Sequence, residues 1–236
     1  MSGLAPHAEE ERIRHVTTCP LCGGERIKHF FTIPPGRGQV KEQYSLFRCN
    51  DCCLGFTSPR PAEEELVRLY DEAFYGSYRV SKQTMDIIDA LFFRGRRRQI
   101  ELHKKPGRLL DVGCGSGRFV RYMAKHGWDT VGYDFSPRAY ELADEQRNGR
   151  VHIIDGKLSD HELPEQSFDV VTLWQVFEHI AEPLGLLAEL RRLLKPGGLL
   201  VIAVPNIDSF QAALTGKRWW GLDIPRHLSH YAPQSL

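Results

Sequence analysis

The chain has 236 residues, and its 31 lysine and arginine residues nearly balance its 30 aspartate and glutamate residues, so the formal charge is +1. This balance excludes a strongly basic nucleic-acid binder and an acidic solvating tail. Hydrophobic residues make up 42% of the chain, which is typical of a globular protein with a sizeable core, and the longest apolar run, 199–204, is too short to span a bilayer.

Residues 1–18 form an N-terminal tail. The tail carries three consecutive glutamates and no apolar stretch, which is unlike a secretory signal. We therefore expect a cytoplasmic protein, in which the six cysteines of the chain make no structural disulfides.

Four of the cysteines form two Cys-x-x-Cys pairs that are separated by 26 residues. Two such pairs can present four thiolates to one tetrahedral ion, so we predict a structural zinc ribbon over residues 19–60. The predicted ligands are Cys19, Cys22, Cys49 and Cys52. A redox-active pair would lie between a strand and a helix, and neither pair has that context. We interpret the adjacent Cys53 as a bystander thiol.

Residues 61–106 are predicted to form a helical linker or lid. One helix is expected to begin near Pro61, and a longer one covers 84–104. The residues expected on the buried side of the longer helix are Met85, Ile88, Leu91, Phe92 and Ile100. Its basic run at 94–98 is interpreted as a solvated face, with contact to the phosphate of an anionic substrate as the alternative.

Strands and helices alternate through the third predicted region, 107–236, which we interpret as one domain. The expected strands are 108–111, 130–133, 151–154, 168–174 and 199–204. The expected helices are 117–126, 137–146 and one that begins at Pro183 and ends at Lys195. This alternation predicts an α/β fold with a Rossmann-like, mostly parallel sheet and helices on both faces.

The segment Leu109-Leu-Asp-Val-Gly-Cys-Gly-Ser-Gly117 places a Gly-x-Gly-x-Gly turn directly after the first of these strands. Glycines there let the chain turn sharply and let a ligand approach the backbone. Arg118 stands where the dinucleotide fingerprint needs glycine, and the carboxylate of Asp111 would repel a pyrophosphate. The motif therefore favours a ligand with an ammonium group and no phosphate, such as S-adenosylmethionine.

The second strand ends at Asp134. An acidic residue at this place can accept two hydrogen bonds from ribose hydroxyls. The alternative is an ordinary surface aspartate at the end of a strand.

Further short motifs accompany the glycine-rich turn. They are Val131-Gly-Tyr-Asp-Phe-Ser136, Ser167-Phe-Asp-Val-Val171, Phe177-Glu-His179 and Leu194-Lys-Pro-Gly-Gly198. In combination, residues 109–205 resemble a class I S-adenosylmethionine-dependent methyltransferase. With the cysteine pairs in front, the chain resembles the subgroup that carries an N-terminal zinc ribbon, although it has Cys53 where that subgroup has glycine.

The resemblance implies a set of cofactor contacts. Gly113, Gly115 and Gly117 would line the methionine part, and Asp111 would orient its amino end. Asp134 would hold the ribose, and Phe135 would pack on the adenine. After the third strand, Asp155 is a candidate for the adenine amino group, with the backbone of Leu158 as the alternative.

The predicted catalytic residues are His179 and its neighbour Glu178. The ordinary pKa of histidine, about 6.5, would let His179 act as a general base near neutrality. Alternatively, the two residues cap a helix and brace the sheet. Some related methyltransferases hold a divalent ion with Glu-x-x-Glu-His, but this chain has Gln175 at the first glutamate position. A cluster of His179, His227 and His230 could still bind a metal.

Several aromatic residues and histidines are predicted to contact the acceptor or to form a lid. They are Tyr75, Tyr78, Trp219, His227 and His230. For the aromatic residues, simple core packing is the alternative.

Methyltransferases of this class usually end with two more strands after the fifth. Only 32 residues follow Val204, and they contain no evident pair of strands. We therefore expect either that the methyltransferase domain is C-terminally incomplete or that a partner, in an oligomer or otherwise, completes the sheet.

The predicted function is methyl transfer from S-adenosylmethionine to a small-molecule acceptor, a sugar or another metabolite, by in-line attack of an O, N or C position on the sulfonium methyl. One alternative is a protein or nucleic-acid methyltransferase guided by the ribbon, although the near-neutral charge disfavours nucleic acid. The other is a non-catalytic module that only binds the cofactor.

Overall fold

The computed structural model describes residues 13–34, 42–62, 65–66, 69, 82–135, 151–154, 158 and 161–236. Contacts group the chain into two compact units, neither of which is continuous in sequence. The first unit comprises Met1–Glu72, Phe177–Leu184 and Val204–Leu236, and the second comprises Ala73–Val176 and Gly185–Ala203. This grouping differs from the sequence-based division, which assigned all of 107–236 to one domain.

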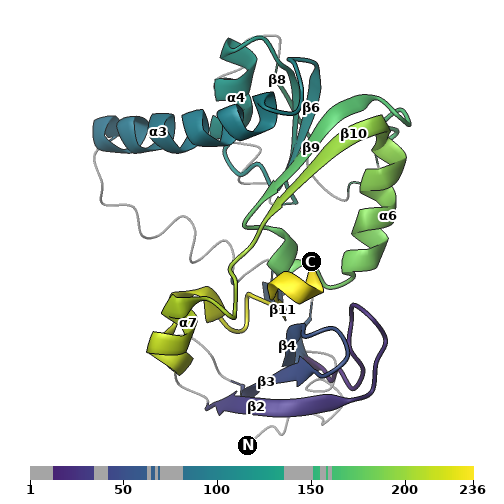
Figure 1. Ribbon diagram of the computed structural model, residues 1–236, viewed down its shortest axis with the longest axis vertical. Coiled ribbons are helices and arrows are strands. Elements are labelled where there is room, and N and C mark those ends of the chain that lie inside the picture. Colours follow the sequence, from purple (N-terminus) through teal and green to yellow (C-terminus); the bar gives the residue numbers. More distant parts are fainter. Residues whose placement is uncertain are drawn as a thin grey trace, which may run out of the picture. The chain divides into compact units, whose positions relative to one another are not determined.

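The second unit contains a five-stranded parallel sheet in the order β10-β9-β6-β7-β8 (Figure 1). The strands are β6 (Arg108–Val112), β7 (Asp129–Tyr133), β8 (Val151–Ile154), β9 (Phe168–Trp174) and β10 (Leu194–Ala203). The predicted α/β class and the parallel sheet are confirmed. The chain starts at the centre with β6, adds strands on one side and then crosses to the other. The strand order therefore reverses between β6 and β9, which is where ligands bind in open α/β sheets.

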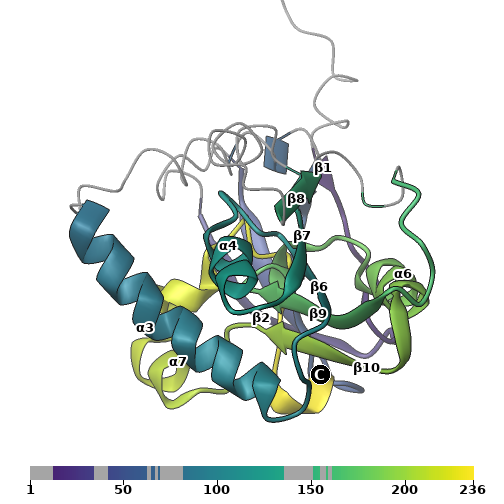
Figure 2. The ribbon, with the colours of Figure 1, turned by 90° about the horizontal axis from the view of Figure 1, so that it is seen from above.

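Two helices cover one face of this sheet, namely α3 (Lys82–Glu101) and α4 (Arg118–Lys125). Their contact with β6 and β9 forms a buried cluster of Ile100, Leu109, Phe119, Met123, Trp128 and Val170. Figure 2 shows α3 and α4 together on one side of the strands and α6 (Pro183–Leu193) on the other. Residues 109–112 of β6 are all buried, because both faces of a parallel sheet are covered.

The predicted buried side of α3 is wrong at two positions, since Leu91 and Phe92 are 66% and 65% exposed. The prediction is confirmed for Ile100, which is buried, and Phe93 also packs toward the sheet. Arg96 lies on the same side, with its guanidinium 4.3 Å from the centre of the Trp174 ring. The basic run is therefore only partly solvated, because one of its cations stacks on an aromatic ring.

The junction between α6 and β10 also differs from the prediction, because the helix ends at Leu193 and the strand begins at Leu194. The backbone N–H groups of Gln166 and Ser167 donate to the carbonyls of Arg192 and Leu193, each over 2.9 Å. These contacts stabilise the helix end, which otherwise has unsatisfied carbonyls. An irregularity in the ladder between Leu194 and Leu199 then accommodates the Lys-Pro-Gly-Gly segment.

The first unit contains a four-stranded sheet in the order β11-β4-β3-β2, in which each neighbouring pair is antiparallel (Figure 1). The strands are β2 (Ile27–Ile33), β3 (Tyr44–Cys49), β4 (Gly55–Ser58) and β11 (Ser229–His230), and a separate pair is β1 (Ile13–Arg14) with β5 (Arg60–Pro61). Strand β11, which pairs Ser229 with Phe56 and His230 with Gly55, was not predicted from the sequence.

Residues after β10 supply much of the core of the first unit. The buried cluster comprises Leu46, Ile207, Ala212, Trp219, Leu222 and Ala232. The N-cap of helix α7 (Phe210–Thr215) is Ser209, whose Oγ accepts a hydrogen bond from the backbone N–H of Ala212 over 3.1 Å. The short 3-10 helices are η2 (Phe177–His179), η3 (Gly216–Arg218), η4 (Trp220–Leu222) and η5 (Pro233–Ser235).

Several predictions fall on residues outside the described ranges. They are the helix at 137–146, most of the helix expected near Pro61, and the candidate site residues Tyr75, Tyr78 and Asp155. The predicted domain boundaries likewise stay predictions.

Candidate functional site

The glycine-rich turn lies between β6 and α4, at the carboxyl end of the central strand. Gly113, Gly115 and Gly117 have φ values of +72°, +53° and +71°, in the left-handed region that favours glycine. The N–H groups of Gly113 and Cys114 both donate to the carbonyl of Tyr133, over 2.7 and 3.0 Å. These bonds attach the turn to the end of the neighbouring strand, β7.

Asp134 follows β7 directly and is 7% exposed. Its Oδ2 accepts a hydrogen bond from the backbone N–H of Gly115 over 2.7 Å. The structure thus brings together the turn and the carboxylate that the sequence singled out, beside the point where the strand order reverses. A carboxylate has about four acceptor positions, so the bond from Gly115 leaves capacity for ribose hydroxyls. The donor set and the glycine turn fit S-adenosylmethionine.

Asp111 lies within the sheet, where its Oδ1 accepts a hydrogen bond from the Thr172 hydroxyl of β9 over 2.6 Å. Burial raises the pKa of Asp111 to about 7, while the Thr172 hydrogen bond and the positive charge of Arg96 act in the opposite direction. The carboxyl group therefore changes its charge near neutral pH. Its predicted contact with the amino end of the cofactor stays a prediction, as does adenine packing by the half-buried Phe135.

A second group of polar residues lies in the first unit, where Glu178, His179 and His227 place one ligand atom each within 4.8 Å of one another. Glu178 and His179 belong to η2, and His227 precedes β11. The Nδ1 of His179 lies 2.9 Å from the carbonyl oxygen of Arg226, and that of His227 lies 2.8 Å from the carbonyl oxygen of Gly221. In each of the two rings, Nδ1 therefore carries the proton and donates a hydrogen bond to the carbonyl.

Burial has opposite effects on the acid and the base of this group. It raises the pKa of Glu178 to about 7, and Asp223 adds to that shift. Burial, together with the neighbouring His227, lowers the pKa of His179 to about 4. His179 is thus neutral near pH 7 but only weakly basic, and this low basicity disfavours the general-base role predicted from its ordinary pKa. The catalytic assignment stays a prediction.

His230 does not join this group, contrary to the three-histidine cluster considered from the sequence. Its Nε2 lies 3.1 Å from the hydroxyl of Thr57, which itself donates to the carbonyl of His227 over 2.9 Å. Burial lowers the pKa of His230 to about 3. His230 therefore connects β11 to β4, and Glu178 takes its place in the cluster of potential ligands.

Trp219 belongs to the buried cluster of the first unit and is 5% exposed. This placement agrees with the alternative of core packing. The ring also borders a hollow of about 250 Å³ that Lys217, Trp220 and Ile224 help to line. The predicted acceptor contacts of Trp219, His227 and His230 stay predictions.

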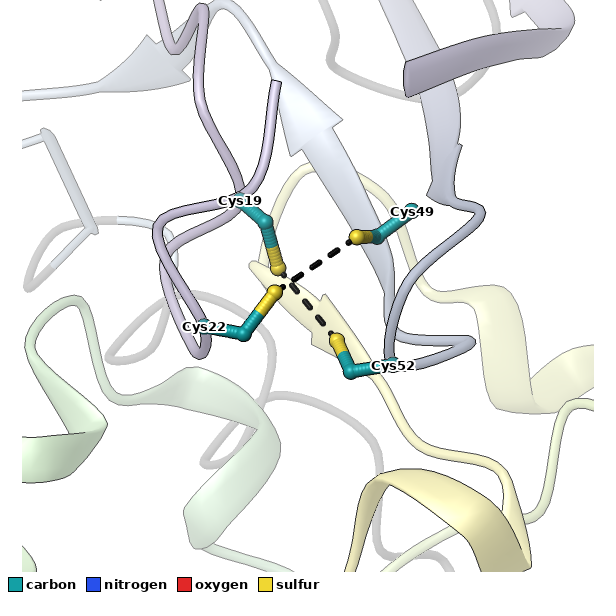
Figure 3. A group of neighbouring side chains, drawn as sticks. All are labelled: Cys19, Cys22, Cys49 and Cys52. Carbon is teal, nitrogen blue, oxygen red and sulfur yellow. Dashed lines mark hydrogen bonds between the residues drawn. The ribbon is translucent and has the colours of Figure 1, made fainter. Parts of the chain in front are cut away.

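The four predicted zinc ligands converge, as Figure 3 shows, with the sulfur atoms of two loops pointing toward a common centre. The Sγ atoms of Cys19 and Cys52 are 3.5 Å apart, and those of Cys22 and Cys49 are 3.6 Å apart. A tetrahedral ion with Zn–S bonds of about 2.3 Å requires sulfur atoms about 3.8 Å apart. The four-thiolate cluster is therefore compatible with zinc.

The two loops have the same backbone geometry. The N–H of Gly23 donates to the carbonyl of Cys19 over 2.9 Å, and that of Cys53 donates to Cys49 over 3.1 Å. Gly23 and Cys53 both have positive φ, +71° and +65°. Cys53 thus occupies the position at which the first loop has glycine, with a backbone angle that glycine adopts more readily.

Two contacts of the site were missed in the sequence. Thr172 lies in an apolar strand, and a lone threonine there gave no sign of a partner. The stacking of Arg96 on Trp174 joins residues far apart in the chain, and no local pattern indicates such a pair.

The comparison with known proteins matches residues 81–236, more than half of the chain, to the family model described as "Methyltransferase domain". The chain belongs to the class I S-adenosylmethionine-dependent methyltransferases. This membership confirms the resemblance stated for residues 109–205. The zinc-ribbon subgroup is supported only as far as the four-cysteine cluster.

Curated relatives of this methyltransferase are similar over part of their length. A ubiquinone biosynthesis O-methyltransferase of Cereibacter sphaeroides is 40% identical over 117 residues, which cover 48% of this chain and 47% of that protein. One of the same name from Thiobacillus denitrificans is 33% identical over 137 residues, covering 53% of this chain and 56% of that protein. The chain therefore spans about half the length of the curated relatives it matches.

A solved structure of a SAM-dependent methyltransferase from Archaeoglobus fulgidus shares the fold, with a TM-score of 0.52 and 23% identity over 71% of this chain and 69% of that one. Among the helices in the described ranges, none has the length and apolar character needed to cross a bilayer.

Proposed function

We propose that this chain binds S-adenosylmethionine at the turn after β6 and transfers its methyl group to a small-molecule acceptor. The observation that carries the proposal is the contact between Asp134 and the backbone of Gly115 at the reversal of strand order. This contact joins a carboxylate at the position suited to ribose hydroxyls with a turn whose three glycines have positive φ. Family membership supplies the reaction class.

The acceptor that we propose is an oxygen atom of a small molecule. The support is the name of the curated relatives, ubiquinone biosynthesis O-methyltransferases, together with the near-neutral charge of the chain. The bound cofactor supplies an already electrophilic methyl group on its sulfonium. The task of the protein is then to hold the acceptor in line with that methyl group and to exclude water.

We further propose that the four cysteines bind one structural zinc ion. Their donor set and sulfur spacing support it, and such an ion stabilises a small unit by about 10–16 kcal/mol. Metal analysis of the purified wild-type chain should find zinc. The Cys49→Ser variant should lose the zinc that this cluster binds. The matched control is Cys53→Ser, which changes a neighbouring thiol outside the cluster and should keep the zinc.

Calorimetric titration with S-adenosylhomocysteine tests the cofactor site. Asp134→Asn removes the charge that holds Gly115 and faces the ribose, so it should weaken binding at least tenfold, since a charge-assisted hydrogen bond contributes about 1.5–3 kcal/mol. The control is Asp129→Asn in β7, the strand that Asp134 follows, because the side chain of Asp129 is 62% exposed. An absence of binding by the wild-type chain, or equal binding by Asp134→Asn, would contradict the proposal.

Turnover is tested with radiolabelled S-adenosylmethionine and a panel of small molecules that offer hydroxyl, amine or carbon acceptors. Transfer to a hydroxyl supports the proposal. Transfer only to protein or nucleic acid, or cofactor binding with no transfer to any acceptor, would favour one of the two alternatives.

A further inference from the structure

The carboxylate of Glu178 is an unusual feature of the first unit. The residue is 1% exposed, and neither Oε1 nor Oε2 has a hydrogen-bond partner among the residues that the structure describes. Buried polar groups are almost always satisfied, and leaving one unpaired is costly. A group outside the described residues should therefore contact this carboxylate.

The two histidines beside it are oriented in the same sense. Because Nδ1 of each ring donates to a backbone carbonyl, at Arg226 and Gly221, the lone pair of each imidazole lies on Nε2. The Nε2 of His227 is 3.9 Å from Oε1 of Glu178. Metal-ligating histidines commonly donate their other nitrogen to a carbonyl or carboxylate, which fixes both the tautomer and the orientation of the ring.

We propose that Glu178, His179 and His227 form a second metal site, which takes a divalent first-row transition-metal ion. Two imidazoles and one carboxylate favour ions such as zinc, cobalt or iron(II) over magnesium and calcium, which prefer all-oxygen ligands. With metal–ligand bonds of about 2.0–2.2 Å, ligand atoms around a tetrahedral ion lie about 3.4 Å apart, so separations of up to 4.8 Å would shorten by at most about 1.4 Å.

Three protein ligands leave at least one coordination position open. Site chemistry of this kind suits an ion that also binds water or an oxygen atom of a ligand. Asp223 lies at the edge of the cluster, where its Oδ2 is 3.9 Å from Nε2 of His227 and its Oδ1 accepts from Arg226 over 2.7 Å. Its charge would thus lie beside the nitrogen that binds the ion and would help to balance the positive charge there.

This site gives Glu178 and His179 a role that differs from the general base predicted from the sequence. A lone pair on Nε2 that binds an ion cannot also take a proton from the acceptor. Metal binding by these side chains is independent of methyl transfer, and it is measured without turnover.

The test uses the whole chain with zinc already bound at the four cysteines, titrated with Co²⁺ and followed by visible absorption. We expect one saturable equivalent of Co²⁺, with the weak ligand-field bands of nitrogen and oxygen coordination and no thiolate charge-transfer band. Glu178→Gln and His227→Gln, which are close in size to the native side chains, should each weaken binding at least tenfold. His103→Gln removes an exposed histidine elsewhere and should change nothing.

A thermal shift completes the experiment in case one variant does not fold. Co²⁺ should raise the melting temperature of the wild-type chain and of His103→Gln but not that of whichever cluster variant folds. The proposal is overturned if wild-type protein shows no saturable Co²⁺ binding, or if the cluster variants bind as tightly as wild type. A spectrum dominated by thiolate charge transfer would overturn it too, because the ion would then lie at the cysteines.

Discussion

Gly113 opens the turn after β6, and a side chain at this position is opposed by two separate effects. Its φ of +72° is unfavourable for any residue with a Cβ. In addition, a Cβ at Gly113 would lie 2.3 Å from Cγ2 and 2.9 Å from Cγ1 of Val176, which is 9% exposed. Gly113→Ala therefore combines backbone strain with overpacking.

The expected loss of stability follows from these two terms. Backbone strain of this kind costs about 1–2 kcal/mol, and overpacking costs about 1–3 kcal/mol. Their sum, about 2–5 kcal/mol, is a large part of the roughly 5–15 kcal/mol that stabilises a typical domain. Because the N–H of Gly113 is bonded to Tyr133, the strain should also displace the turn and weaken binding of S-adenosylhomocysteine.

Urea denaturation and calorimetry of four variants, one of them Val176→Ala alone, separate the terms. Gly197→Ala is the control, because Gly197 has φ of +73° and a Cβ there would meet no described atom within 4 Å, so it should show only the strain. Gly113→Ala combined with Val176→Ala should recover part of the loss, with an interaction energy of about 0.5–3 kcal/mol. If Gly113→Ala destabilises the chain no more than Gly197→Ala, the reasoning about Val176 is refuted.

Three other predictions concern stability. Because the pKa of Asp111 rises from 3.8 to about 7 on folding, the carboxyl group stabilises the fold below about pH 4, and this stabilisation is lost as the pH rises to 7. The unfolding free energy of wild type relative to Asp111→Asn should fall over this range by at most about 4 kcal/mol, and a constant difference would contradict the shift. Cys53→Gly should be about 1 kcal/mol more stable than Cys53→Ala in urea denaturation, because only glycine relieves the positive φ; equal stability would argue against strain. Thr57→Val should lose about 2–4 kcal/mol in the same assay, since it unpairs the His227 carbonyl and His230, whereas Thr57→Ser keeps the hydroxyl; similar losses in both variants would show that the hydrogen bonds contribute little.

The sequence predicted those parts of the fold whose signal is local. The strands of the parallel sheet are short segments that contain apolar residues, and the turn at 113–117 needs glycine for its backbone angles, so both were found from neighbouring residues. The paired cysteines were found for the same reason, because the spacing within each pair is set by one loop.

Features that depend on distant residues were not predicted. Strand β11 has two residues and forms only because β4 offers it an edge, so no pattern at 229–230 announces it. Periodicity also placed Leu91 and Phe92 on the buried side of α3, whereas the packing of Phe93 and the stacking of Arg96 on Trp174 set the actual face. The prediction for His179 used an ordinary pKa, and the burial that lowers this pKa arises only in the folded chain.

The pairing of β11 with β4 has a consequence for how the chain is synthesised and how it can be cut. Thr57 and His230, which bond across this pairing, are 173 positions apart, so the sheet around the cysteines has a high contact order. During translation the cysteine loops emerge first, yet the edge of β4 stays uncovered until the whole of the second unit has been made. The cysteine-bearing segment is therefore not expected to fold when it is separated from the rest of the chain. Excising or transplanting residues 1–72 alone would leave behind the strand and the core side chains that complete this unit.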